Sequence, residues 1–356
     1  MRKSDPGPAP TERNDGARTP RFSLRFASSS ARSIVLVSIL SAVLLVLAFY
    51  RSDPWIIAEH VSSVLRDRRW TFLVAAFGVD LIILMARVAK WRAILLPTKH
   101  VPLLSLFSAI VIGIASNNLL FFRFDELVRA YVLGTREKLS KGFVLGTIAV
   151  ERAWDLTVIL IVFGITGFAF AVTRELLLAG IVAAALCVCG LAALLLIARK
   201  EEGFVSLVRR LGDRFSLGAA LARAASSFAG GVRAFPRDCR ILWLLGASTA
   251  EWAGEILFVW LVTVAVGIEL SLPAMMLFVV ASFLSFATPS SPAAVGPYHF
   301  LGTCALYACA APIELKNSFV VVAHAMMVIP VSIIGIFFLW REGLSFSRIH
   351  RRLQDG

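Results

Sequence analysis

The residues that could do chemistry in this sequence are charged side chains beside or inside long apolar segments. Arginine guanidinium groups can hold a phosphate through two parallel hydrogen bonds. Glu126 lies three residues before Arg129 and could pair with it on one face of a helix. This first group could bind an anionic headgroup, or it could be a charged cytoplasmic loop that sets the topology. Its members are Asn117, Asn118, Arg123, Asp125, Glu126 and Arg129.

A second group stands at the start of the next apolar run. Glu151 and Asp155 are four residues apart, so they share a helix face, and Arg152 lies beside them. Charged groups at membrane depth are costly and by default face a cavity or one another. The group could therefore take part in a binding site, and the alternative is a structural ion pair with the preceding loop.

The third group, Glu251 and Glu255, lies inside an apolar helix with the same four-residue spacing. Two carboxylates on one face repel each other unless a cation or a proton intervenes. This pattern favours a charge-balancing or proton-coupling role. The alternative is a purely structural pairing with arginine side chains from elsewhere in the chain.

The histidines are scattered and form no ligand set. His299 opens a short segment after Pro297, where the free N–H groups of a helix N-terminus favour an anion. His324 stands alone in an apolar segment, and we expect it to be buried and hydrogen-bonded. The acids lie next to arginines and not histidines, so neither a metal nor another cofactor is expected. The sequence also contains no nucleotide-binding P-loop and no Asp-x-Asp motif.

The composition indicates that this chain lies in a membrane. Of its 356 residues, 58% are hydrophobic and only 17% are charged, which excludes a soluble enzyme. The net charge of +13 is attributed to cytoplasmic Lys and Arg, as is usual in membrane proteins, and not to nucleic-acid binding. The five cysteines lack paired spacing and indicate neither a disulfide framework nor a zinc site.

Apolar segments that the sequence predicts as helices differ in length. Two of them, 273–288 and 298–311, are too short to span the bilayer, and the prolines between them cannot continue a helix. They predict a re-entrant hairpin, and 103–121 with the amphipathic stretch after it predicts a second one. The other apolar segments are 33–50, 70–96, 142–172, 176–198, 241–266 and 318–340.

Loop charges test this arrangement, because cytoplasmic loops are enriched in Lys and Arg. Suppose that both hairpins return to the side they came from. The segments 199–240, with nine Lys or Arg, and 87–102, with four, then lie inside, and the outer loop 267–272 contains no Lys or Arg. Only 51–69, with four, does not fit. The sequence thus predicts an all-α polytopic membrane protein with about six full transmembrane helices, two re-entrant helical hairpins and an inverted repeat.

The predicted organisation has one membrane domain between two cytoplasmic ends. Residues 1–32 form a disordered basic tail, because proline and charge leave too little apolar surface to fold. Residues 33–340 form the transmembrane domain, with 199–240 as a cytoplasmic amphipathic loop. Residues 341–356 form a cytoplasmic tail.

Three motifs resemble those of the lysylphosphatidylglycerol synthase transmembrane, or flippase-like, family. The run from Asn118 to Arg129 resembles the signature Asn-x-x-Pro-x-Arg-x-Gly-Glu-x-x-Arg, with Phe121 and Asp125 in place of proline and glycine. Glu151-Arg152-Ala-Trp-Asp155 is similar to Glu-Arg-x-x-Asp. The segment 289–299 is similar to the proline-rich re-entrant segment, with Ala293 where glycine is usual.

The resemblance implies a protein of the bacterial cytoplasmic membrane that moves an anionic phospho- or isoprenoid lipid between leaflets. It implies no soluble catalytic domain here, because the chain ends soon after the last apolar segment. The alternatives are a membrane-embedded lipid headgroup transferase or a noncatalytic scaffold for lipid-synthesis enzymes, which would then be its partners. The headgroup residues expected from spacing and resemblance are Asn118, Arg123, Arg129, Arg152, Ser290, Ser291 and His299. Those expected to balance charge or carry protons are Glu126, Glu151, Asp155, Glu251 and Glu255.

Overall fold

The structure, a computed structural model, is mostly helical in the part of the chain that it describes. It describes residues 26–120, 125–169, 174–214, 217–235, 238–287, 291–307 and 309–343. Every regular element in these ranges is a helix, so the all-α class predicted from composition is confirmed. The predicted tail residues 1–25 and 344–356 lie outside the described residues.

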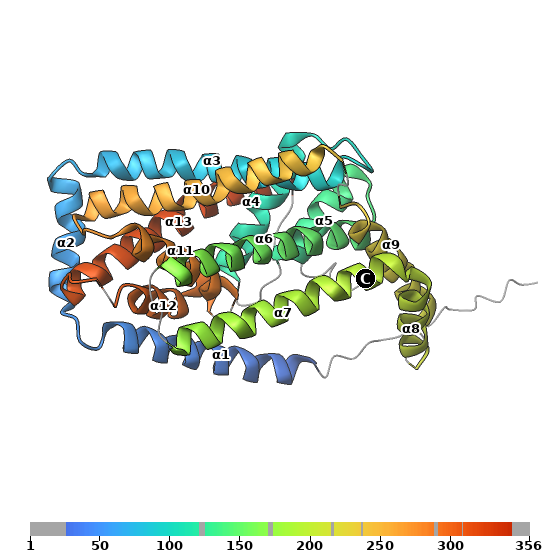
Figure 1. The fold of residues 1–356 in the computed structure, drawn as a ribbon, viewed down its shortest axis with the longest axis horizontal. Helices are drawn as coiled ribbons and strands as arrows, with labels where there is room; N and C mark the ends of the chain where they lie inside the picture. The colour runs from blue at the N-terminus through green and yellow to red at the C-terminus, as the bar shows by residue number, and fades with distance from the viewer. Residues whose placement is uncertain are drawn as a thin grey trace, which may run out of the picture.

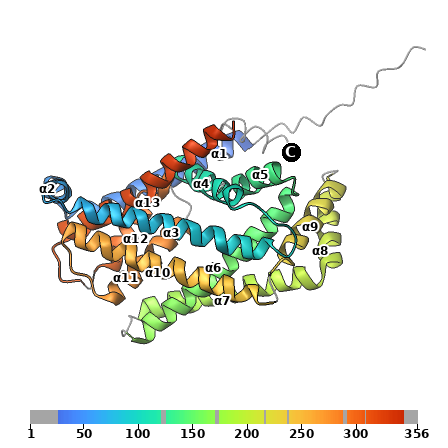
Figure 2. The same cartoon turned by 90° about the horizontal axis from the view of Figure 1, so that it is seen from above.

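The described helices contain the same series of elements twice. Each series has a long helix, a hairpin of two shorter helices and a second long helix (Figures 1 and 2). The first series consists of α3 (Trp70–Leu95), α4 (Leu103–Leu119), α5 (Asp125–Glu137) and α6 (Lys141–Ala169). The second consists of α10 (Arg240–Val266), α11 (Leu272–Ala287), α12 (Pro297–Ala305) and α13 (Ile313–Arg341). We call these two series the first half and the second half.

The opening helices of the two halves, α3 and α10, pack against each other in opposite directions. Ile83 of α3 packs at Gly254 of α10, and seven residues further along α3, Lys90 bonds to Glu251, earlier in α10. Each hairpin packs on the closing helix of the other half, α4 on α13 and α11 on α6. These contacts agree with the inverted repeat expected from the loop charges, which stays a prediction.

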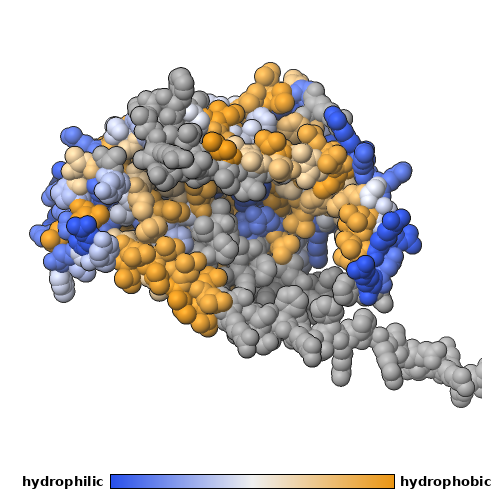
Figure 3. Space-filling model, turned by 60° about the horizontal axis from the view of Figure 1, so that its bottom comes forward, coloured by the Kyte–Doolittle hydropathy of each residue, from blue (hydrophilic) through white to orange (hydrophobic). Residues whose placement is uncertain are grey.

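Three described helices are long and apolar enough to cross a membrane. They are α3, α10 and α13. A fourth candidate combines α1 (Phe26–Phe49) with α2 (Pro54–Arg66), which meet at a bend of 81°. The structure therefore supports a polytopic membrane protein, whereas six full spans and the membrane depth of the hairpins stay predictions. Figure 3 agrees with this placement, because apolar side chains cover the flank and hydrophilic ones gather at both ends.

Several expected boundaries are corrected by the structure. Helix α1 begins at Phe26, inside the predicted tail. The segment 51–69, expected as a loop, contains α2. Pro54 can begin this helix because the first turn leaves its N–H groups unpaired and proline has none. The side chain of Asp53 caps the N-terminus of α2. The predicted helix 298–311 is only α12, which ends at Ala305.

The segment 199–240, expected as a loop, is also mostly helical. After α7 (Arg174–Arg199) it contains α8 (Glu201–Asp213) and α9 (Gly218–Val232). Helix α9 packs on α6 at glycines, because a Cβ on Gly146 would lie 2.2 Å from the carbonyl oxygen of Phe228. The close approach of two backbones explains why the segment is part of the folded bundle. In Figures 1 and 2, α8 and α9 lie together at one end of the molecule.

We predict that the α8 end faces the cytoplasm and the opposite end, with the α10–α11 connection, faces outside. Ser206 on α8 and Glu269 after α10 are both exposed, so single cysteines at these positions in a cysteine-free background should react from opposite sides. An impermeant maleimide applied to intact cells should label the Glu269 position only. Equal labelling of both positions from outside would contradict the topology.

Candidate functional site

A seam of charged residues lies where α3 packs against α10. Positions 76, 80, 83, 87 and 90 of α3 recur every three or four residues, which places them on one helix face. Ala76 and Ile83 on this face belong to the hydrophobic core shared with α10. Asp80, Arg87 and Lys90 interrupt it with charge.

Lys90 is the most deeply buried charge of the seam, with a side chain 0% exposed. Its ammonium donates to Asp155 Oδ1 of α6 at 2.5 Å and to Glu251 Oε2 of α10 at 2.5 Å. The lysine therefore joins three long helices and both halves. A buried ammonium is tolerated here because two carboxylates replace its hydration.

Arg87 connects the two glutamates of α10. Its Nε donates to Glu251 Oε1 at 3.0 Å, and its Nη2 donates to Glu255 Oε1 at 3.0 Å. The repulsion expected between the carboxylates is thus offset by a guanidinium from the other half, which is the structural alternative left open by the sequence. Arg87 and Lys90 had been counted in a cytoplasmic loop at 87–102, and this is wrong, because both lie inside α3.

A second charged cluster lies where Arg152 of α6 meets the first turn of α5. Its Nη2 donates to Asp125 Oδ2 at 2.9 Å, and its Nε lies 3.3 Å from Glu126 Oε1. Asp125, which stands where the resembled motif has glycine, is thus one of the two carboxylates that neutralise this arginine. The predicted pairing of Glu126 with Arg129 is replaced by pairing with Arg152.

Arg129, one helical turn after Asp125 on α5, is buried. Its Nη2 donates to Glu151 Oε2 at 2.6 Å, and its guanidinium lies 4.2 Å from the centre of the Trp91 ring. Gly113 of α4 leaves room for the side chain, since a Cβ there would lie 2.6 Å from Arg129 Cγ. The ion pair between α5 and α6 fixes the first hairpin on its closing helix.

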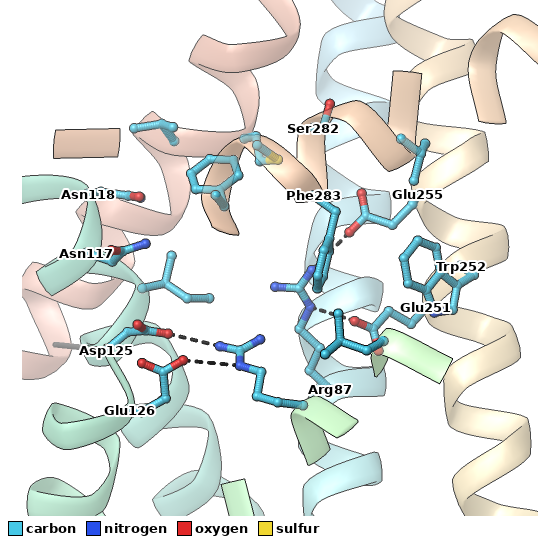
Figure 4. Close-up of a pocket in the computed structure, with 17 residues that line it drawn as sticks. Arg87, Asn117, Asn118, Asp125, Glu126, Glu251, Trp252, Glu255, Ser282 and Phe283 are labelled. Atoms are coloured by element: carbon cyan, nitrogen blue, oxygen red, sulfur yellow. Dashed lines mark hydrogen bonds and ion pairs between the residues drawn. The ribbon is translucent and has the colours of Figure 1, made fainter. Parts of the chain in front are cut away.

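A cavity of about 520 Å³ separates the two charged clusters. In Figure 4, Asp125 and Glu126 face Glu251 and Glu255 across this space. Arg152 pairs with the first two acids and Arg87 with the other two. One cluster comes from the first hairpin and α6, and the other from the α3–α10 seam. Apolar side chains complete the wall, among them Ile114, Leu156, Val279, Phe283, Phe286 and Met327.

The two asparagines at the end of α4 also line the cavity (Figure 4). Asn118 Nδ2 donates to Ser332 Oγ of α13 at 3.0 Å. This bond ties the tip of the first hairpin to the closing helix of the second half. Asn118 thus has a structural contact at the edge of the predicted site.

Ser291 and His299 lie in the second hairpin and do not line the cavity. The Ser291 N–H donates to Ser41 Oγ of α1 at 3.0 Å, and its hydroxyl donates to Val295 O at 2.7 Å. The His299 ring is buried 4.9 Å from the ring of His324, centre to centre. As expected, His324 is buried and hydrogen-bonded, with Nε2 2.8 Å from Ala293 O.

The short helix η1 (Pro292–Ala294) explains a preference of the resembled motif. Ala293 has a φ of 55°, in the left-handed region that favours glycine. Glycine would adopt this conformation without strain at the position where this chain has alanine. The turn therefore keeps its shape at some conformational cost.

The structure thus gathers part of the predicted site and adds residues to it. Asn118, Glu126, Arg152, Glu251 and Glu255 line the cavity, whereas Arg129, Glu151 and Asp155 lie directly behind it around a smaller space. Arg123 and Ser290 lie outside the described residues. Sequence reasoning missed Asp80, Arg87 and Lys90, although their spacing inside the apolar segment 70–96 was a usable signal.

Fold and site together define a helical membrane protein with a charged cavity between its two halves. The profile of the family described as lysylphosphatidylglycerol synthase TM region matches residues 34–335. The chain belongs to this family, and the family ties it to lipid-related processes in a membrane. No curated protein and no solved structure matches the chain.

We predict that Lys90→Met destabilises the protein strongly, by about 3–5 kcal/mol, because Asp155 loses its ion-pair partner while buried. Glu251 keeps Arg87. The double variant Lys90→Met/Asp155→Asn removes the uncompensated charge and should recover more than half of the loss. Thermal unfolding in detergent measures both effects.

Lys99→Met is the matched control for this prediction, because Lys99 is partly exposed and pairs with Glu137 near the surface. Its melting temperature should stay close to that of the wild type. A Lys90→Met variant as stable as Lys99→Met would show that the buried ammonium does not hold the halves together.

Proposed function

We propose that this protein moves an anionic phospho- or isoprenoid lipid between the leaflets of a bacterial cytoplasmic membrane. In this proposal the chain is a transporter and not an enzyme, with both termini in the cytoplasm. Its substrate partner is a membrane lipid, with lipid-synthesis enzymes as a further partner class and no role for nucleic acid.

The cavity between the two halves is the observation that carries the proposal. Its volume of about 520 Å³ is within the range of small-molecule sites, which suits a lipid headgroup but not a whole lipid. The acyl or isoprenoid chains would therefore stay in the bilayer while the headgroup passes through. Sites between inverted repeats near the middle of the membrane are typical of alternating-access transporters.

The two guanidinium groups in the wall supply the chemistry for a phosphate. The side chains of Arg152 and Arg87 are 37% and 29% exposed, so both can be reached from the cavity. Each is held by carboxylates in the structure. A headgroup phosphate would replace a carboxylate on the guanidinium fork, because both anions accept the same pair of parallel hydrogen bonds.

The balance of charge in the wall limits how an anion can enter. Four carboxyl groups line the cavity with only two guanidinium groups, Arg87 and Arg152. An anionic headgroup would meet repulsion unless a displaced carboxylate takes up a proton or a cation. The proposal therefore includes cations or protons that accompany the lipid, and it assigns charge balance to Glu126, Glu251 and Glu255.

We predict that Arg152→Ala slows lipid movement by roughly tenfold or more, because a charge-assisted hydrogen bond contributes about 1.5–3 kcal/mol. Arg152→Lys should restore only part of the rate, since a lysine cannot form the bidentate contact. The assay follows bleaching of a fluorescent phospholipid or polyprenyl phosphate analogue in proteoliposomes.

Arg209→Ala, an exposed arginine on α8, is the matched control and should keep the wild-type rate. All variants are compared at equal amounts of folded protein. Full activity of Arg152→Ala would move the headgroup site away from this cavity.

A further inference from the structure

Asp80 is a buried acid in the α3–α10 seam that the proposed headgroup site does not use. It is 7% exposed, and its Oδ2 has no hydrogen-bond partner. Among the described residues, it is the one buried carboxyl group with neither a hydrogen bond nor an ion pair. At 1.5 Å per residue it lies about 15 Å from the start of α3, near the middle of this helix.

The neighbouring groups leave Asp80 without a cation of its own. Ile83, three residues after Asp80 on the same face of α3, packs at Gly254 of α10, so Glu255 lies beside this face, and Arg87 lies two turns after Asp80. Arg87 is engaged by Glu251 and Glu255, and Lys90 by Asp155 and Glu251. The seam therefore contains four carboxyl groups and two cations.

In the described part of the chain, no ion pair joins Asp80 to a cation on the other helices packed against α3. Helix α4 has no titratable side chain, and Arg152 of α6 pairs with Asp125 and Glu126. On α13, Lys316 lies in the first turn and forms no ion pair with Asp80, and His324 is bonded to Ala293 O. Apolar residues of the core, Ala76 and Ile83, flank Asp80 on its own face of α3. A carboxylate in such surroundings lacks both water and a counter-charge, so the neutral acid is the favoured form.

From this placement we propose that Asp80 binds a proton that exchanges with the cavity by way of Glu255. The binding step is protonation of the Asp80 carboxylate to the neutral acid, and release returns the same proton to Glu255 or to cavity water. This inference rests on the proposed function in one respect: the role of the Asp80 proton is to accompany an anionic headgroup into the cavity. The proton site itself can be tested without any transported lipid.

Infrared spectroscopy of the full-length protein in nanodiscs tests the site directly. A protonated carboxyl group has a C=O stretching band that a carboxylate lacks. We expect this band in the wild type at neutral pH, its loss in Asp80→Asn, and its retention in Asp238→Asn, a matched control at an exposed acid paired with Arg240. Absence of the band from the wild type, or its unchanged presence in Asp80→Asn, would overturn the proposal.

A second variant covers the case in which Asp80→Asn does not fold. Asp80→Glu keeps a titratable group, so its band should persist at a shifted frequency, and an unshifted band would assign the proton to another residue. In proteoliposomes with a pH gradient, wild type should accumulate the lipid analogue on one side and Asp80→Asn should not. Without lipid movement in the wild type, the proposed function fails while the infrared result still decides the proton site.

Discussion

The fully buried ammonium of Lys90 is the interaction on which the arrangement of this protein depends. It lies between Asp155 of the first half and Glu251 of the second half, 2.5 Å from each. Removing three charged groups from water is costly, and the cost is offset only if all of them stay paired. The positions of α3, α6 and α10 are therefore coupled, because moving any of them would leave a charge unpaired.

The cavity follows from this coupling. Arg87, one helical turn before Lys90, extends the same network to Glu255 and so forms one wall. The Arg129–Glu151 pair holds the first hairpin on α6, which places Arg152 and its carboxylates opposite. Each wall is stabilised by contacts behind it. The cavity can therefore offer charged groups to a headgroup without depending on that headgroup for its shape.

Much of the architecture could be predicted from the sequence, because it depends on local rules. Apolar length identified the long helices, and the prolines at 289–297 identified the break in the second hairpin. The charges of the loops predicted opposed halves, although Arg87 and Lys90 were counted as loop residues and lie inside α3. The acids of α6 and α10 stood out by their four-residue spacing.

The pairing of these charges could not be predicted, because it depends on which helices meet. Glu251 and Glu255 look like a repelling pair until α3 brings Arg87 between them. Arg129 and Arg152 look equivalent in sequence, yet only Arg152 lines the large cavity, because Arg129 is buried between Glu151 and the Trp91 ring. His299 follows a helix-breaking turn as expected, but packing against α1 keeps it away from the cavity.

The central claim is that the cavity between the halves holds a lipid headgroup. Native mass spectrometry of the protein extracted from bacterial membranes tests this claim most directly. The account predicts that one class of phosphate-bearing lipid remains bound to the wild type. It should be lost when Ser282→Trp fills the cavity in protein that still folds. Retention of the same lipid by the filled variant, or a wild type that carries no phosphate-bearing lipid, would contradict it.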